Sequence, residues 1–248
     1  MRRRFLRKNL LFVGLALGSV VGPVHAGTVT FVTPPGSTVG GEPVSASATF
    51  TTSGNTLTIT LTDLLANPNN VGSLLSDLLF TTNGGSLTGA TQTAASSSEI
   101  TVAGDGSFTG PTPISGVATV GWPFTVNSAT SGTLDVLSGP GHAGPAHLII
   151  GPPGPGGTYS NANGSIAGNG PHNPFLFESA TFTITGAGIS ADTTITSATF
   201  SFGTTAGVNV PGVAVPEPNS LVLSLTGMGL AGIIGIYRSR RRGRTVGA

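Results

Sequence analysis

Three histidines lie close together in the sequence, and imidazole nitrogens are common protein ligands of transition metals. His142 and His147 share one Gly- and Pro-rich segment, and His172 follows in another. Together with a carboxylate such as Asp135 or Glu178, they would suit Zn²⁺, Ni²⁺ or Cu²⁺ and a secreted metal-dependent enzyme. Their spacing matches no metalloenzyme motif such as HExxH. The sequence therefore favours histidines that hydrogen-bond to the backbone of their loops.

Two aromatic residues are candidates for binding carbohydrate, because exposed aromatic rings stack on the faces of sugars. Trp122 is the only tryptophan, and Tyr159 lies in a long Gly-rich segment. A tryptophan buried in a β-sandwich core is the more common arrangement. The core is therefore the favoured position for Trp122, and a carbohydrate-binding module remains the alternative function.

The remaining polar residues give no catalytic signature. Asp105 lies between two glycines, where it would suit either a Ca²⁺ ligand or a hairpin turn, and Asp-Gly favours the turn. The chain has no cysteine and no GxSxG motif, and nothing selects a catalytic pair among its nine carboxylates. We therefore expect a protein that is not an enzyme and that needs no cofactor, with Ca²⁺ as the candidate ion for its carboxylates.

The charges are divided between the ends of the chain and its interior. All ten basic residues lie at or before Lys8 or at or after Arg238, whereas all nine acidic residues lie between Glu42 and Glu217. An interior without Lys or Arg cannot neutralise phosphates, which argues against binding nucleic acid and against phosphoryl transfer. A separation of this kind is typical of targeting segments at the two ends.

Residues 27–213 have the pattern of a single all-β domain, a β-sandwich or jelly-roll. Thr and β-branched residues favour strands, and clusters of Gly and Asn favour turns between them. Alternating residues predict a hairpin of 44–50 and 57–61 around Gly54. Helical spacing predicts one short helix near 71–77, and residues 151–173 form a long loop. The other predicted strands are 28–33, 77–82, 98–103, 116–126, 132–137, 146–150, 178–185 and 194–202.

Residues 1–26 have the three parts of a secretory signal peptide. Basic residues come first, residues 10–22 are uncharged and mostly apolar, and small residues at Val24 and Ala26 form the cleavage site. The apolar segment is shorter than the roughly 20 residues that a membrane-spanning helix needs. We expect signal peptidase to cleave between Ala26 and Gly27.

Residues 214–244 have a second three-part pattern. Pro216, Glu217 and Pro218 precede residues 220–237, which carry no charge. As a helix this segment would be about 27 Å long, close to the thickness of a bilayer core. The arginines that follow would stay on the cytoplasmic side of the membrane; they include Arg238, Arg240, Arg241 and Arg242.

This order of motif, apolar span and arginines closely resembles the PEP-CTERM sorting domain. The resemblance implies that Pro216, Glu217 and Pro218 are recognised by an exosortase, a membrane-embedded protease or transpeptidase. It also implies a precursor anchored in the inner membrane by one helix and then released or attached at the surface of a bacterial cell. Such proteins often occur where exopolysaccharide or a biofilm matrix is made. We therefore expect a structural or adhesive protein of the cell surface, with exopolysaccharide as a candidate partner.

Overall fold

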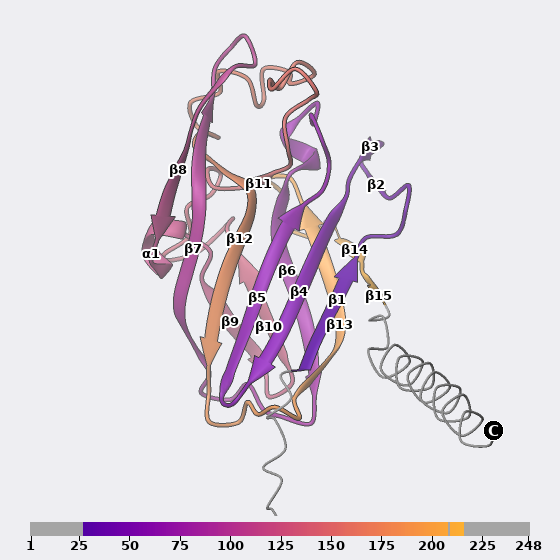
Figure 1. Cartoon of the computed structure of the whole chain (residues 1–248), viewed down its shortest axis with the longest axis vertical. Coiled ribbons are helices and arrows are strands. Elements are labelled where there is room, and N and C mark those ends of the chain that lie inside the picture. Colours follow the sequence, from indigo (N-terminus) through magenta and orange to yellow (C-terminus); the bar gives the residue numbers. More distant parts are fainter. Residues whose placement is uncertain (1–26, 208, 216–248) are drawn as a thin grey trace, which may run out of the picture.

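The structure is a computed structural model that describes residues 27–207 and 209–215 (Figure 1). Its elements are almost all β-strands, so the predicted all-β class is confirmed. Thirteen of the strands in this part of the chain join in one sheet, and two more form a small separate hairpin. No helix within the described ranges is long and apolar enough to cross a membrane.

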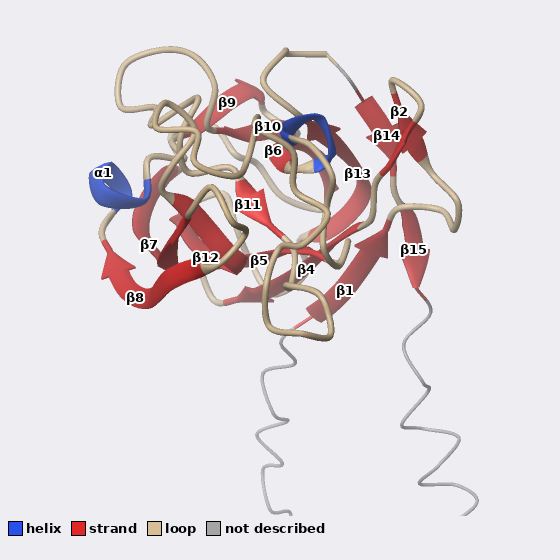
Figure 2. Cartoon of the chain, turned by 90° about the horizontal axis from the view of Figure 1, so that it is seen from above, coloured by secondary structure: helices blue, strands red, loops and turns tan. Residues whose placement is uncertain are grey.

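The large sheet folds over so that its two halves face each other (Figures 1 and 2). The first half has the strand order β8-β7-β12-β5-β4-β1-β15, and the second has the order β9-β10-β6-β13-β14. The short β11 connects them, because it pairs in parallel with β12 and antiparallel with β6. The bounds of the first half are β8 Phe108–Ser115, β7 Thr91–Val102, β12 Phe175–Thr185, β5 Thr56–Asp63, β4 Ala46–Ser53, β1 Gly27–Val32 and β15 Val213–Val215.

The second half packs against the first through large apolar side chains. Its bounds are β9 Phe124–Ser128, β10 Ser131–Asp135, β6 Leu75–Asn83, β13 Thr194–Phe202 and β14 Asn209–Pro211, with β11 at Ile149–Ile150. The ring of Phe50 on β4 lies 5.4 Å from the ring of Phe80 on β6, measured between centroids. Contact between rings from the two halves shows that the core lies between them.

The predicted hairpin is confirmed as β4 and β5. Buried and half-buried residues alternate along both strands, as the period of two requires, and Leu57, Ile59 and Leu61 face the core. Gly54 turns the chain with a φ of 57°, a conformation that glycine adopts without steric cost. Strands were also found at all the other predicted positions except 116–126, with changes at their ends.

Two predictions of local structure need correction. Residues 71–77 form only the single 3₁₀ turn η1, Val71–Ser73, because β6 begins at Leu75. Residues 116–126 are not one strand, because glycines break the segment at both ends of a short helix, α1 Val117–Val120. Gly116 and Gly121 have φ values of 106° and 70°, and the second ends the helix in the left-handed conformation.

The remaining segments lie at the edges and ends of the sheet. The hairpin of β2 Thr38–Val39 and β3 Glu42–Pro43 was not predicted, nor was β8, which pairs only with β7. β15 pairs with β1 and extends two residues beyond residue 213, the predicted end of the domain. The loop 151–173 contains no strand, yet its Tyr159 and Ile166 are buried.

Candidate functional site

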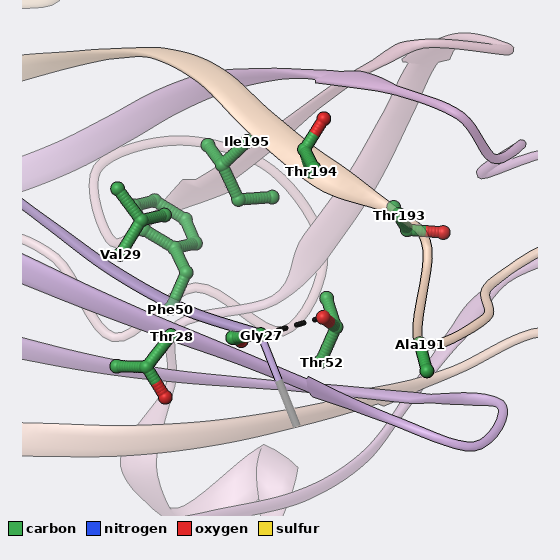
Figure 3. A pocket seen from close by; sticks show the side chains of 9 residues that line it. All are labelled: Gly27, Thr28, Val29, Phe50, Thr52, Ala191, Thr193, Thr194 and Ile195. Carbon is green, nitrogen blue, oxygen red and sulfur yellow. Dashed lines mark hydrogen bonds between the residues drawn. The ribbon is translucent and has the colours of Figure 1, made fainter. Parts of the chain in front are cut away.

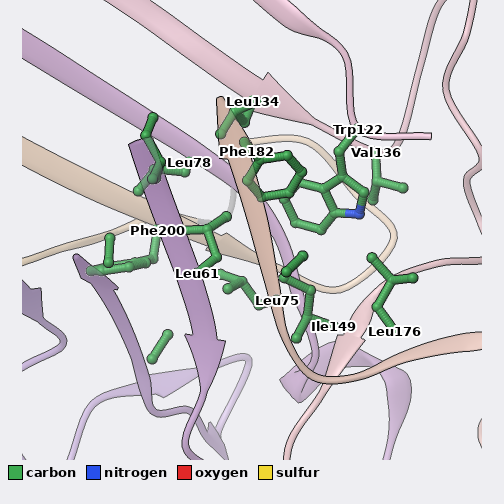
Figure 4. Packing of buried hydrophobic residues seen from close by; sticks show 14 of the residues in the cluster. Leu61, Leu75, Leu78, Trp122, Leu134, Val136, Ile149, Leu176, Phe182 and Phe200 are labelled. Atoms are coloured by element: carbon green, nitrogen blue, oxygen red, sulfur yellow. The ribbon is translucent and has the colours of Figure 1, made fainter. Parts of the chain in front are cut away.

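The aromatic pair proposed for carbohydrate binding is buried, so that prediction is wrong. The Trp122 ring packs on Phe182 in the core (Figure 4). Its Nε1–H donates a hydrogen bond of 2.8 Å to the carbonyl of His147. The Tyr159 hydroxyl donates to the carbonyl of Gly151 over 2.9 Å. Both side chains are at most 1% exposed, so neither offers a face to a sugar. The favoured core position of Trp122 is confirmed.

The three histidines do not form one ligand set. His142 lies 3.6 Å from Asp135 through its Nε2, and the Nδ1 of His172 donates to the carbonyl of Ser165. Within residues 27–207 and 209–215, no three His, Cys, Asp or Glu side chains are placed to share a metal ion. The predicted hydrogen bonds to backbone are found for His147 and His172, whereas His142 contacts the side chain of Asp135 instead.

His147 joins two parts of the core through both ring nitrogens. Its Nδ1 lies 3.0 Å from the carbonyl of Val120, which can only accept, so this nitrogen carries a proton. Its Nε2 lies 2.9 Å from a carboxylate oxygen of Glu99, a contact that also needs a proton between the two atoms. His147 therefore bridges the carbonyl of Val120 and the carboxyl group of Glu99. It fixes the loop before β11 to β7, which is a structural role.

Asp105 lies in the hairpin between β7 and β8, so the predicted turn is confirmed. Its Oδ1 accepts hydrogen bonds from both the backbone and the hydroxyl of Ser107, and these bonds lower the pKa of Asp105. The connection has five residues, where Asp-Gly alone suggests two. Its exposed carboxylate is used for local turn hydrogen bonds.

Asp77 and Asp135 form a pair of carboxylates that the sequence did not reveal. They are direct partners in the antiparallel pairing of β6 with β10. Burial, and to a lesser extent the charge of Asp135, raises the pKa of Asp77 to about 7. Asp135 also contacts His142, whose Nε2 lies 3.6 Å from its carboxylate. Burial therefore disfavours a negative charge on Asp77. Among the described residues, no feature other than these two acids indicates that a ligand binds here.

A mostly apolar pocket of about 240 Å³ lies between the start of β1 and the start of β13 (Figure 3). Val29, Phe50 and Ile195 supply its apolar wall. At its rim, Thr52 donates a hydrogen bond of 3.3 Å to the carbonyl of Gly27. Gly27, the first residue after the predicted cleavage position, therefore lies in β1 and pairs with Thr52 of β4.

The strongest candidate for a binding site is a polar groove on the β8-β7-β12 side of the sheet. We call it the bulge groove; its volume is about 400 Å³, within the range of small-molecule sites. Residues of three adjacent strands line it: Ser96, Ser97, Ser98, Pro111, Phe177, Glu178, Ser179 and Thr181. Five of these eight side chains carry a hydroxyl, one carries a carboxylate and one is aromatic.

Irregularities in both neighbours of β7 form this groove. On β12, Leu176 pairs with Glu99 and Ala180 with Ser97, so the three residues 177–179 lie opposite Ser98 alone. On β8 the register also shifts, between the partners of Glu99 and Thr101. Extra residues of this kind bend a strand and redirect its side chains, and they are common beside functional sites.

Glu178 has a strained backbone at the centre of the bulge. Its φ is 62°, in the left-handed region that glycine and asparagine adopt more easily than a long side chain does. Such a conformation costs about 1–3 kcal/mol. Within the described chain, the carboxylate of Glu178 belongs to no ion pair. A strained residue with an unpaired charge in a groove is the most specific functional signal in this structure.

Phe177 is supported by other aromatic rings. Its centroid lies 5.7 Å from that of Phe108, which in turn lies 5.6 Å from that of the buried Tyr159. Phe177 itself is half-buried and is one of the residues that line the groove. The row gives the groove one rigid apolar surface next to its carboxylate.

Only part of this site is marked in the sequence. Glu178 is an isolated acid in a strand of apolar, Ser and Thr residues, and the sequence suggests it only as a further ligand beside the histidines. Nothing local marks Phe177 as accessible, because alternation along a regular strand does not foresee a bulge. The predicted targeting residues lie outside the described part of the chain, apart from Gly27: Ala26, Pro216, Glu217, Pro218 and the arginines from Arg238 to Arg242.

Comparison of the chain with family models, with curated proteins and with solved structures found no match.

Proposed function

We propose that this chain is an exported, exosortase-processed protein of the cell surface or extracellular matrix, with a structural or adhesive role. Its precursor carries a signal peptide in residues 1–26 and one transmembrane helix in the PEP-CTERM segment 214–244. Its folded body, of β-sandwich or jelly-roll type, is the part delivered outside the inner membrane. Signal peptidase, the exosortase and the membrane are its partners during export.

The segregation of charge is the observation that carries this proposal. The ten basic residues flank the apolar segments at the two ends, where export and membrane orientation require them. The described body has eight acidic residues and no Lys or Arg. After removal of both ends the protein would be strongly acidic, which favours solubility outside the cell.

The test is to replace Pro216, Glu217 and Pro218 together with alanine in a host that has an exosortase. We expect the variant to accumulate in the membrane fraction as a larger form, whereas the unchanged chain is processed. A matched control replaces Glu42 and Pro43, a Glu-Pro pair on β3 in the body, and should be processed normally. Normal processing of the first variant would refute the sorting role.

The other end is tested by mass spectrometry of the mature protein. We expect its first residue to be Gly27, and replacing Ala26 with arginine should block cleavage because the site needs a small residue. A mature protein that retains residues before Gly27 would contradict the signal-peptide boundary. The same spectra locate the C-terminal cleavage site.

A further inference from the structure

We propose that the bulge groove binds a neutral saccharide, with Phe177 as the stacking surface and Glu178 as the principal hydrogen-bond acceptor. This inference deepens the adhesive part of the proposed function and rests on it for its biological meaning. It assigns carbohydrate binding to residues other than the buried Trp122 and Tyr159.

The side chains of the groove match the two surfaces of a sugar ring. A pyranose has faces of C–H groups, which pack on an aromatic ring, and a rim of hydroxyls, which are donors and acceptors. Glu178 offers two acceptor oxygens, and the serine hydroxyls of β7 offer both donors and acceptors. A volume of about 400 Å³ suits one or two sugar units and leaves a chain free to continue into solvent.

The charge of the body selects a ligand without negative charge. A phosphate, sulfate or uronic acid would meet Glu178 with no cation to offset it, because the chain has no Lys or Arg between Lys8 and Arg238. A metal ion is a poor occupant, since Glu178 is the one carboxylate among the groove's lining residues and Ca²⁺ takes six to eight oxygen ligands. A neutral, hydroxyl-rich ligand remains.

The groove is also held in place before a ligand arrives. The Ser97 hydroxyl donates a hydrogen bond of 2.7 Å to the carbonyl of Ser179, which ties the bulge of β12 to β7. The Thr181 hydroxyl is 3.2 Å from that of Thr60 on β5, and the ring of Phe108 packs against that of Phe177. A site built on strands with fixed side chains loses less entropy on binding than one built on a mobile loop.

The test measures binding by the full chain, solubilised in a detergent without a sugar headgroup. The probes are neutral hexasaccharides of glucose, mannose, galactose and xylose, with a chitosan hexamer as the cationic probe and an oligogalacturonate as the anionic one. Isothermal titration calorimetry and saturation-transfer NMR detect binding. We expect at least one neutral hexasaccharide to bind and the oligogalacturonate not to bind.

Variants then locate the site. Glu178→Gly should weaken binding by about tenfold or more, because charged hydrogen bonds are lost. The same change removes the left-handed strain, so its Tm should be unchanged or higher, which separates binding from folding. Phe177→Leu keeps most of the packing but removes the flat ring, and should also weaken binding. Asp192→Asn removes an exposed charge elsewhere and should bind as the unchanged chain does.

Three results would overturn the inference: no binding of any neutral probe, binding of only a charged probe, or binding that Glu178→Gly and Phe177→Leu leave intact. If Glu178→Gly does not fold, Glu178→Gln replaces it in the same comparison. Export and processing are measured separately, in cells. A processed surface protein that binds no saccharide would refute this inference alone, and binding by a chain that is never exported would refute the proposed function alone.

Discussion

The buried carboxylate of Asp77 should make the protein less stable as the pH rises. Its pKa is raised to about 7 in the folded protein, mainly by burial, against an ordinary value of 3.8. The folded state therefore holds a proton between these two values that the unfolded state has released. Because the folded state binds more protons, the free energy of unfolding falls as pH rises from about 4 to 7, and it is constant with respect to this group above 7.

The size of the effect follows from the shift in pKa. A difference of about three pKa units at about 1.4 kcal/mol each gives an upper bound of about 4 kcal/mol above pH 7. Asp77 is half-buried, and solvent reduces this value, so we expect about 2–4 kcal/mol. Asp77→Asn removes the ionisable group with little change in shape. At pH 8 it should raise the free energy of unfolding by this amount, and at pH 4 it should change it little.

The assay is urea unfolding of the unchanged chain and the variant at pH 4, 6 and 8, followed by circular dichroism. The two stabilities should be similar at pH 4 and diverge as the pH rises. Asp135→Asn should produce a smaller change in the same direction, because it removes the lesser cause of the raised pKa of Asp77 and also weakens the contact of Asp135 with His142. Asp192→Asn is the control for an exposed carboxylate. A difference between Asp77→Asn and the unchanged chain that does not vary with pH would refute the reasoning.

Three further predictions concern the core. Trp122→Phe should cost about 2–4 kcal/mol in urea unfolding, because it leaves a cavity and an unpaired carbonyl at His147, whereas a loss below 1 kcal/mol would contradict the buried hydrogen bond. Gly121→Ala should lower the Tm by several degrees, since its φ is 70° and its new Cβ would clash with Ala143; an unchanged Tm would contradict that packing. Burial raises the pKa of Asp63 well above its ordinary value, so Asp63→Asn should stabilise the fold more at pH 8 than at pH 5, and equal effects at both would contradict the shift.

The regular part of the fold could be predicted because it depends on local periodicity. Leu57, Ile59 and Leu61 alternate with threonines, and one face of β5 is buried, so sequence pattern and structure agree. β8 was missed because Pro111 and Pro113 argue against a strand. An edge strand tolerates them, since it needs backbone donors on one side only, and β8 pairs with β7 alone.

The candidate site could not be predicted because it depends on a departure from periodicity. Glu178 lies in a left-handed conformation that no neighbouring residue specifies, and it results from the change of partners along β12. Upstream residues of that strand pair with β11, whereas Ser179 and those after it pair with β5. Such a change is set by the meeting of three strands from distant parts of the chain. The exposure of Tyr159 and Phe177 could not be predicted for the same reason, since it depends on what covers each ring.

The composition of the body now has a structural explanation that bears on its partner. Threonine hydroxyls pair across neighbouring strands on the sheet surface, as in Thr28 with Thr51 and Thr30 with Thr49. These contacts take the place that Lys–Glu pairs have on most sheets, and they stabilise strand pairing without charge. Both ion pairs in the described chain instead involve a histidine. On this hydroxyl-rich surface, Glu178 lies beside Phe177 and belongs to neither of these ion pairs. A ligand that is neutral and rich in hydroxyls would meet no repulsion from its charge.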